Sequence, residues 1–190
     1  MTKRVIIMNF EMNAQAYQAF SEIKKLRSSE GLKGEQMAVV THSKEGTHQF
    51  KMEDFVDFTG TNKSSKAGMI GMLIGLLGGP LGMMLGWFGG RMIGGNQDMQ
   101  EIQKAQSIFT FVGNKIDEGE TGLILIADEE DNRPINNLIM YELHGEVSRF
   151  DLEEVEEEIQ KAKEVELSAK ETAKKNWNEK HSEENEENNN

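Results

Sequence analysis

The residues best suited to chemistry in this sequence are a short acidic run and two pairs of titratable side chains. Residues 128–131 (Asp-Glu-Glu-Asp) could gather a divalent cation, but they lack the alternate ligands, central glycine and late glutamate of a calcium loop. Asp54 and Asp57 lie three apart in a predicted strand, a spacing that points them to opposite faces. His42 and His48 flank a predicted turn without a third ligand nearby in sequence. We therefore predict a solvated acidic loop and no metal site.

The sequence carries none of the short motifs that organise familiar active sites. It has no Gly-x-Ser-x-Gly elbow, no Gly-x-x-x-x-Gly-Lys phosphate loop and no dinucleotide-binding fingerprint in its glycine-rich stretch. It contains no cysteine, which excludes disulfides, thiolate zinc sites, iron–sulfur ligation and cysteine nucleophiles. We predict a protein that is not an enzyme and has no catalytic residue, cofactor or metal. An enzymatic alternative would need a pocket lined by His42, His48 or the Asp128 loop.

The charge of the chain argues against nucleic acid as a partner. Its 190 residues include 21 Lys and Arg against 33 Asp and Glu, a net charge of −12. Phosphate binding relies on clustered basic side chains, which this balance does not favour. Residues 151–190 hold 14 of the acids and six of the lysines, a net of −8. The apolar run near the start is too short for a signal peptide, so we expect the N-terminus in the cytoplasm.

The elements that position these residues can be predicted from the spacing of apolar side chains. Short β-branched runs predict buried strands, a three-to-four-residue spacing predicts amphipathic helices, and a glycine-containing connection predicts a hairpin. In chain order we expect a strand at 5–10, a helix at 13–29, a hairpin of strands 36–42 and 48–58, a helix at 97–116, a central strand at 122–127, a short helix capped by Asn132 or Arg133, and an edge strand at 146–150.

This order of elements predicts an α+β fold in which helices cover one face of a mainly antiparallel sheet. The ferredoxin-like sandwich, a split βαβ arrangement, is the most economical topology for that order. We therefore predict an α+β domain over residues 1–150, interrupted by a glycine-rich apolar segment at residues 67–95.

The glycine-rich segment, residues 67–95, has no charged residue from Ala67 to Gly90. Four-residue steps place its glycines on one face of a helix, where another backbone can approach closely. The opposite face carries large apolar side chains, and Trp87 with Phe88 would suit an interfacial anchor. The two glycine series and the proline between them are Gly71, Gly75, Gly79, Pro80, Gly82, Gly86, Gly90 and Gly94.

The segment predicts a glycine-zipper helical hairpin rather than a single membrane span. Pro80 interrupts the helix at its middle, and a single crossing would separate strands that belong to one sheet. Each arm of about 13 residues would be about 20 Å long, short of the roughly 30 Å of a bilayer core. Lys63, Lys66 and Arg91 flank the segment, as expected if both ends face the cytoplasm. Such a hairpin could dip into one leaflet, form the core of an oligomer, or fold onto its own domain.

Several stretches of the chain carry a resemblance when taken in order: VIIMNF, GLKGEQMAVV, HQFKMEDFVDFTG, the glycine-rich segment, FVGNKIDEGETGLILIA and ELHGEVSRFDL. Together, from about Val5 to Asp151, they resemble a bacterial family of predicted membrane proteins catalogued as domain of unknown function 1269. The match is one of order and character and includes no catalytic signature. It implies a ferredoxin-like domain with an inserted glycine-rich hairpin, membrane association and no established activity. The long acidic tail and the Met-rich hairpin depart from that pattern.

The end of the chain predicts an acidic amphipathic helix over residues 151–175. Asp151 followed by Glu154 fits a capping box, and several glutamates stand four residues before a lysine. We expect this helix to pack back on the domain or to pair with another helix, and residues 176–190 to be disordered because they are acidic and rich in asparagine. The apolar stripe of the helix is Leu152, Val155, Ile159 and Ala162.

These features lead to two functional hypotheses. In the first, the protein is non-enzymatic and membrane-associated on the cytoplasmic side, and its hairpin inserts into lipid and mediates self-association. In the second, it is a soluble cytoplasmic homo-oligomer whose hairpins form the core, with a ligand-binding or stress-related α+β domain. Only the first hypothesis predicts that removing the hairpin frees the protein from membranes.

Overall fold

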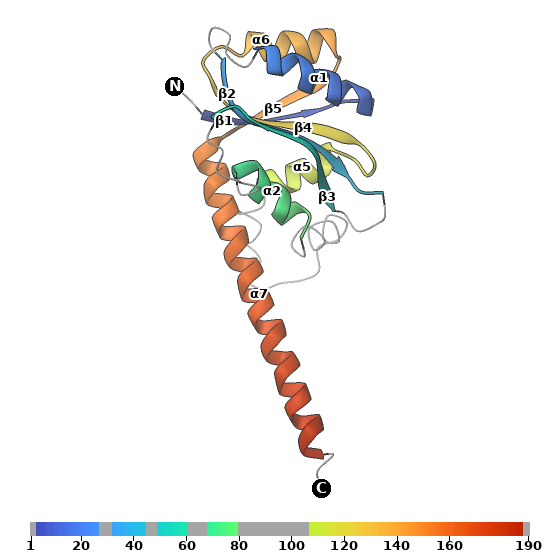
Figure 1. Ribbon diagram of the computed structural model, residues 1–190, viewed down its shortest axis with the longest axis vertical. Helices are drawn as coiled ribbons and strands as arrows, with labels where there is room; N and C mark the ends of the chain where they lie inside the picture. Colours follow the sequence, from blue (N-terminus) through green and yellow to red (C-terminus); the bar gives the residue numbers. More distant parts are fainter. Residues whose placement is uncertain (1–2, 27–31, 45–48, 61–67, 80–106, 188–190) are drawn as a thin grey trace.

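The computed structural model describes residues 3–26, 32–44, 49–60, 68–79 and 107–187. In this part of the chain a five-stranded antiparallel sheet lies between two layers of helices (Figure 1). The strands are β1 (Lys3–Asn9), β2 (Leu32–His42), β3 (Phe50–Asp57), β4 (Thr121–Glu129) and β5 (Glu146–Asp151). The helices are α1 (Asn13–Leu26), α2 (Met69–Leu77), α5 (Ser107–Lys115), α6 (Arg133–Asn136), the π-helix η1 (Asn137–Glu142) and α7 (Leu152–Glu187).

The central strand of the sheet is β4. The strand order is β3-β2-β4-β1-β5, which confirms the predicted central position of residues 122–127 and the edge position of β5. The strands β1, β2 and β4 are apolar at consecutive positions, so they present apolar side chains to both faces of the sheet. In β1, for example, Val5 and Ile7 lie in one core cluster whereas Ile6 and Met8 lie in the other.

A sheet that is apolar on both faces needs cover on both faces, and this corrects the expectation of helices on one face only. Helices α1, α6 and η1 cover one face and enclose a core cluster around Phe20, Ile23 and Ile139. Helices α2 and α5 and the first turns of α7 cover the other face and enclose a second cluster around Leu73 and Phe109. The molecule therefore has three layers (Figure 1).

Strands that are neighbours in the sheet are mostly distant in the chain, and β3 forms the edge next to β2. Here β4 pairs with β2 on one side and with β1 on the other, and both pairings are antiparallel. The β2–β3 hairpin forms as predicted, with Val39 opposite Asp54. The observed class is thus a mixed α+β fold with an antiparallel sheet. Its strand order depends on non-local pairing, which local apolar patterns do not determine.

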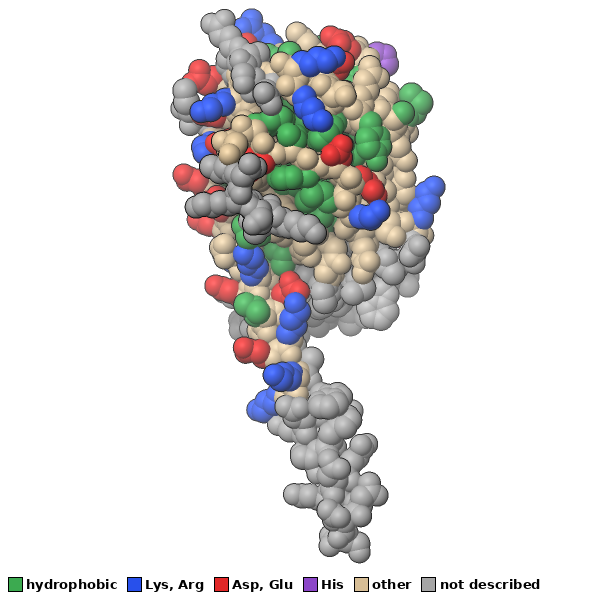
Figure 2. All heavy atoms as spheres, in the orientation of Figure 1, with side chains coloured by type: hydrophobic (Ala, Val, Ile, Leu, Met, Phe, Trp, Pro, Cys, Tyr) green, Lys and Arg blue, Asp and Glu red, His purple; other side chains and the backbone are tan. Residues whose placement is uncertain are grey.

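Helix α7 follows β5 directly and projects beyond the sheet domain (Figure 1). The Asp151 carboxylate accepts a hydrogen bond from the backbone N–H of Glu153 at 2.9 Å, as expected of a capping residue. The structure continues the helix to Glu187, through residues 176–187 that the composition predicts to be disordered. That stretch contains neither proline nor glycine, so no residue in it breaks a helix. On the face shown in Figure 2, most of the coloured side chains on the part of α7 just beyond the sheet domain are charged.

Candidate interaction segment

The described start of the glycine-rich segment is helix α2, and its large side chains are buried in the protein's own core. They pack on the face of the sheet that carries Ala38 and Val40 of β2. Of the three arrangements open to the hairpin, this arm adopts the one that folds onto its own domain. The buried residues of α2 are Ile70, Leu73, Ile74, Leu76 and Leu77, each at most 6% exposed.

The glycines of α2 occupy the side of the helix that the large side chains leave open. Gly75 is exposed, and a Cβ atom placed there would meet no described heavy atom within 4 Å. Gly71, one turn earlier, is half-buried. The glycine face of this arm therefore points outward, where a second backbone could approach.

The end of α2 needs glycine for a different reason. A Cβ atom on Gly78 would lie 2.9 Å from the backbone oxygen of Phe50 in β3. A Cβ atom on Gly79 would lie 3.0 Å from the backbone oxygen of Gly75. At these two positions the chain passes so close to other backbone atoms that only glycine fits without a shift.

The remaining residues predicted for the hairpin lie outside the described part of the chain. They are Pro80, Gly82, Gly86, Trp87, Phe88, Gly90 and Gly94. None of the helices formed by the described residues combines the length and apolar character needed to cross a membrane.

Helix α7 contacts both helices that bracket the undescribed residues 80–106. The Lys163 ammonium donates to the sulfur of Met72 in α2 at 2.8 Å. The carboxylate of Glu158 accepts a hydrogen bond from the backbone N–H of Ile108, at the start of α5, at 2.9 Å. A carboxylate at that position also lies at the positive end of the helix dipole, where a negative charge stabilises the helix. Sequence reasoning missed both contacts because no local pattern pairs residues so far apart in the chain.

The carboxylates of Glu129 and Asp131, in the acidic run 128–131, bind different partners and do not form one site. The side chain of Glu129 is 1% exposed and accepts two hydrogen bonds from Arg149, at 2.6 and 2.8 Å. Asp131 instead receives two-point hydrogen bonding from the exposed Arg133, and these bonds lower the pKa of its carboxyl to about 2. The run therefore contains one buried structural ion pair and one surface pair. The partner of Glu129 was not predicted, since Arg149 lies two strands away in the sheet.

The predicted histidine and aspartate pairs are not brought together as reactive pairs. His42 is buried, stacks on Phe50 with ring centroids 4.3 Å apart, and donates from Nδ1 to the backbone oxygen of Ile116 at 2.7 Å. His48 lies outside the described residues. Asp54 and Asp57 point to opposite faces of β3, as their spacing predicts, and each accepts a local backbone hydrogen bond.

Three or more His, Asp or Glu side chains placed to hold a metal ion are not found within the described ranges. The geometry instead singles out the outward glycine face of α2 and the α7 contacts beside it. Comparisons with models of protein families, with curated proteins and with solved structures find no match to this chain.

Proposed function

We propose that this chain is a non-enzymatic protein that associates with the cytoplasmic side of a membrane and self-associates through its glycine-rich segment, residues 67–95. One observation carries the proposal: residues 67–90 have no charge in a chain whose net charge is −12. An uninterrupted apolar stretch of that kind favours contact with lipid or with another protein. Membrane lipid and further copies of the chain are the proposed partners, and nucleic acid is not one of them.

The arms of the segment have different parts in this proposal. Helix α2 attaches the segment to the sheet through its buried side chains. The second arm, residues 81–95, makes the first contact with lipid, with Trp87 and Phe88 at the membrane interface. The outward glycines of α2 supply a surface for another copy, as in glycine-zipper hairpins generally.

A second candidate function has specific support from the burial of α2. Because the large side chains of this arm already pack in their own core, the arm as placed has only its glycine face left for contact. A soluble homo-oligomer in which hairpins of several copies meet through these faces is consistent with that geometry. Its α+β domain would then have a ligand-binding or stress-related duty.

Vesicle flotation tests the proposal, and the buried side chains of α2 determine which residues can be replaced. Deleting all of residues 67–95 would remove the five buried side chains of α2 and damage the core. The variant should therefore replace only residues 81–95 with a Gly-Ser linker. We expect the intact chain to float with phosphatidylcholine vesicles and the linker variant to stay at the bottom of the gradient.

The matched control is Leu167→Ser on α7, which changes another apolar side chain that is 61% exposed. This variant should float like the intact chain. An intact chain that stays at the bottom as a discrete oligomer would contradict membrane association and support the second candidate. In that case Gly75→Leu should convert the oligomer to smaller species in analytical ultracentrifugation.

A further inference from the structure

This inference rests on the proposed function and asks how helix α2 could join the second arm, residues 81–95, at the membrane. A hairpin that enters lipid with both arms needs its first arm free, yet the apolar side chains of α2 are buried against the sheet. For α2 to reach a membrane it must leave the sheet. The contacts that hold α2 in place would therefore control how much of the segment is available to lipid.

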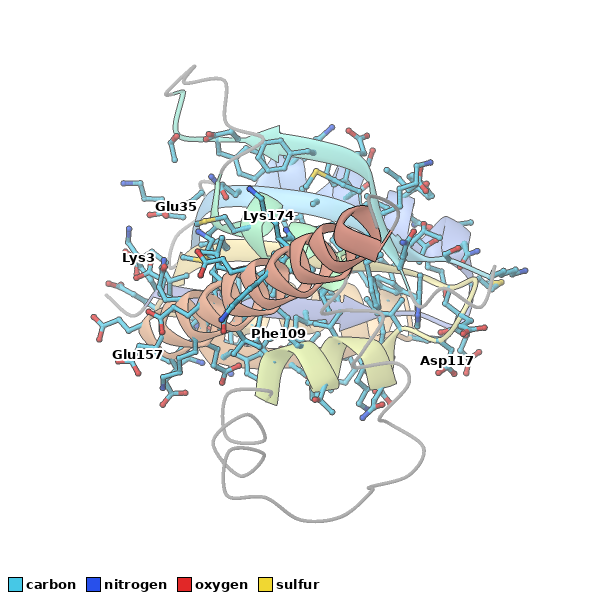
Figure 3. The ribbon with its side chains drawn as sticks, turned by 90° about the horizontal axis from the view of Figure 1, so that it is seen from below. Lys3, Glu35, Phe109, Asp117, Glu157 and Lys174 are labelled. Carbon is cyan, nitrogen blue, oxygen red and sulfur yellow. The ribbon has the colours of Figure 1, made fainter. Side chains whose placement is uncertain are left out.

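The element placed to exercise that control is the docked part of α7, residues 152–166. Figure 3 shows α7 running across the helical layer beneath the sheet, close to Phe109 of α5. Its buried side chains Val155, Ile159 and Ala162 belong to the same core cluster as those of α2 and α5. This part of α7 thus shares one core with the helices on both sides of residues 80–106.

Two polar contacts of α7 lie on the helices that precede and follow residues 80–106. Lys163 contacts Met72 of α2, and Glu158 caps the first turn of α5. At the C-terminal end of α2, the Glu166 carboxylate lies 3.6 Å from where a Cβ atom on Gly79 would be. When α7 opens, these charged groups can bind water in place of their protein partners. Breaking their contacts therefore costs less free energy than exposing apolar side chains.

We propose that residues 152–166 of α7 form an autoinhibitory clamp. With the clamp docked, α2 stays in the core and its apolar side chains are withheld from lipid. When the clamp opens, α2 leaves the sheet and joins the second arm at a lipid surface. Local opening of one such unit while the rest of a fold persists is common in proteins.

The first test compares two double variants of the full chain that leave its net charge unchanged. Glu158→Ala with Lys163→Ala removes the clamp contacts. Glu157→Ala with Lys161→Ala removes a neighbouring surface pair whose side chains are 74% and 60% exposed; Figure 3 shows Glu157 pointing away from the core. We expect the clamp variant to speed hydrogen–deuterium exchange of the α2 amides by about tenfold or more, with β4 unchanged. The control should exchange like the intact chain.

Two results of this comparison would overturn the clamp. Exchange of the α2 amides at the same rate as in the intact chain would show that α7 does not hold α2 in place. Faster exchange of the α2 and β4 amides together would show that α7 is simply part of one cooperative core. Because exchange is measured without lipid, it decides the clamp even if the chain proves not to bind membranes.

The second test locks the clamp in a chain that has no cysteine of its own. Met72→Cys with Lys163→Cys is bridged by a short bis-maleimide, and the same variant capped with N-ethylmaleimide is the control. We expect the bridged protein to lose at least tenfold in flotation with phosphatidylcholine vesicles relative to the capped one. Equal flotation would overturn the inference, whereas failure of both forms and of the intact chain to float would overturn the proposed function instead.

Discussion

Glu129 and Arg149 show how one pair of side chains secures the face of the sheet beneath α6. Their side chains are 1% and 16% exposed, and Arg149 also donates to Asn136 of α6 at 2.9 Å. Glu129→Ala would leave the mostly buried guanidinium of Arg149 without its carboxylate partner. We therefore expect a loss of about 3–5 kcal/mol in the free energy of unfolding, measured with urea. Asp131→Ala, which removes an exposed pair, should lower the unfolding midpoint far less. Equal midpoints for the two variants would contradict this assignment.

Asp131 offers a prediction about pH. Side-chain hydrogen bonds from Arg133, with a further bond from its backbone N–H, lower the pKa of the Asp131 carboxyl from 3.8 to about 2. Since the pKa is lower in the folded chain, the contact stabilises the fold above about pH 4 and that contribution is lost as the pH falls toward 2. Carboxyl ¹³C NMR should give a midpoint near 2, moving toward 3.8 in Arg133→Ala. A midpoint near 3.8 in the intact protein would exclude this contact in solution.

At the scale of the element, α2 predicts opposite effects for two neighbouring glycines. Gly75→Ala places a methyl group in open space within a helix and should raise the free energy of unfolding by about 0.5–1 kcal/mol. Gly78→Ala would press a Cβ atom against the backbone oxygen of Phe50, so we expect a loss of about 1–3 kcal/mol. Thermal unfolding of the two variants measures both. The same sign for both would mean that α2 does not end against β3 as described.

Helix α7 should contribute to stability only through its docked turns. Ile159 is fully buried, so Ile159→Ala should cost about 2–5 kcal/mol in the free energy of unfolding. Leu167 lies two turns later and is 61% exposed, so Leu167→Ala should change it by less than about 0.5 kcal/mol. Urea unfolding followed by circular dichroism distinguishes them. A large loss from the Leu167 variant would show that the docked part extends further along the helix.

Much of the local structure could be predicted because it depends on local patterns. Apolar runs located the five strands that the described residues form, and the cap at Asp151 marked the start of α7. The contacts that link distant residues could not be predicted in this way. Nothing near Glu158 in sequence indicates that it caps α5, and nothing near Arg149 indicates that it binds Glu129. The glycine spacing placed Gly75 on one face of a helix, but it did not indicate which surface covers the other face of α2.

For the whole molecule, the decisive property is a sheet that is apolar on both faces. The continuous runs in β1, β2 and β4 contain the information for a covered sheet, and they place β4 at its centre. They do not say on which face each helix lies, because either choice would bury the same strand residues. That ambiguity explains why helices were expected on one face of the sheet only, whereas the described helices lie on both faces. The third layer is the one that holds α2, the candidate segment's first arm.

The measurement that tests the membrane claim most directly is fractionation of native cells followed by an alkaline carbonate wash. It should compare the intact chain with the variant in which a Gly-Ser linker replaces residues 81–95, since that variant keeps the buried side chains of α2. We predict that the intact chain stays in the membrane pellet after the wash and that the variant becomes soluble. An intact chain that remains in the soluble fraction as a large particle would contradict the claim, and the glycine faces would then be contacts between protein subunits.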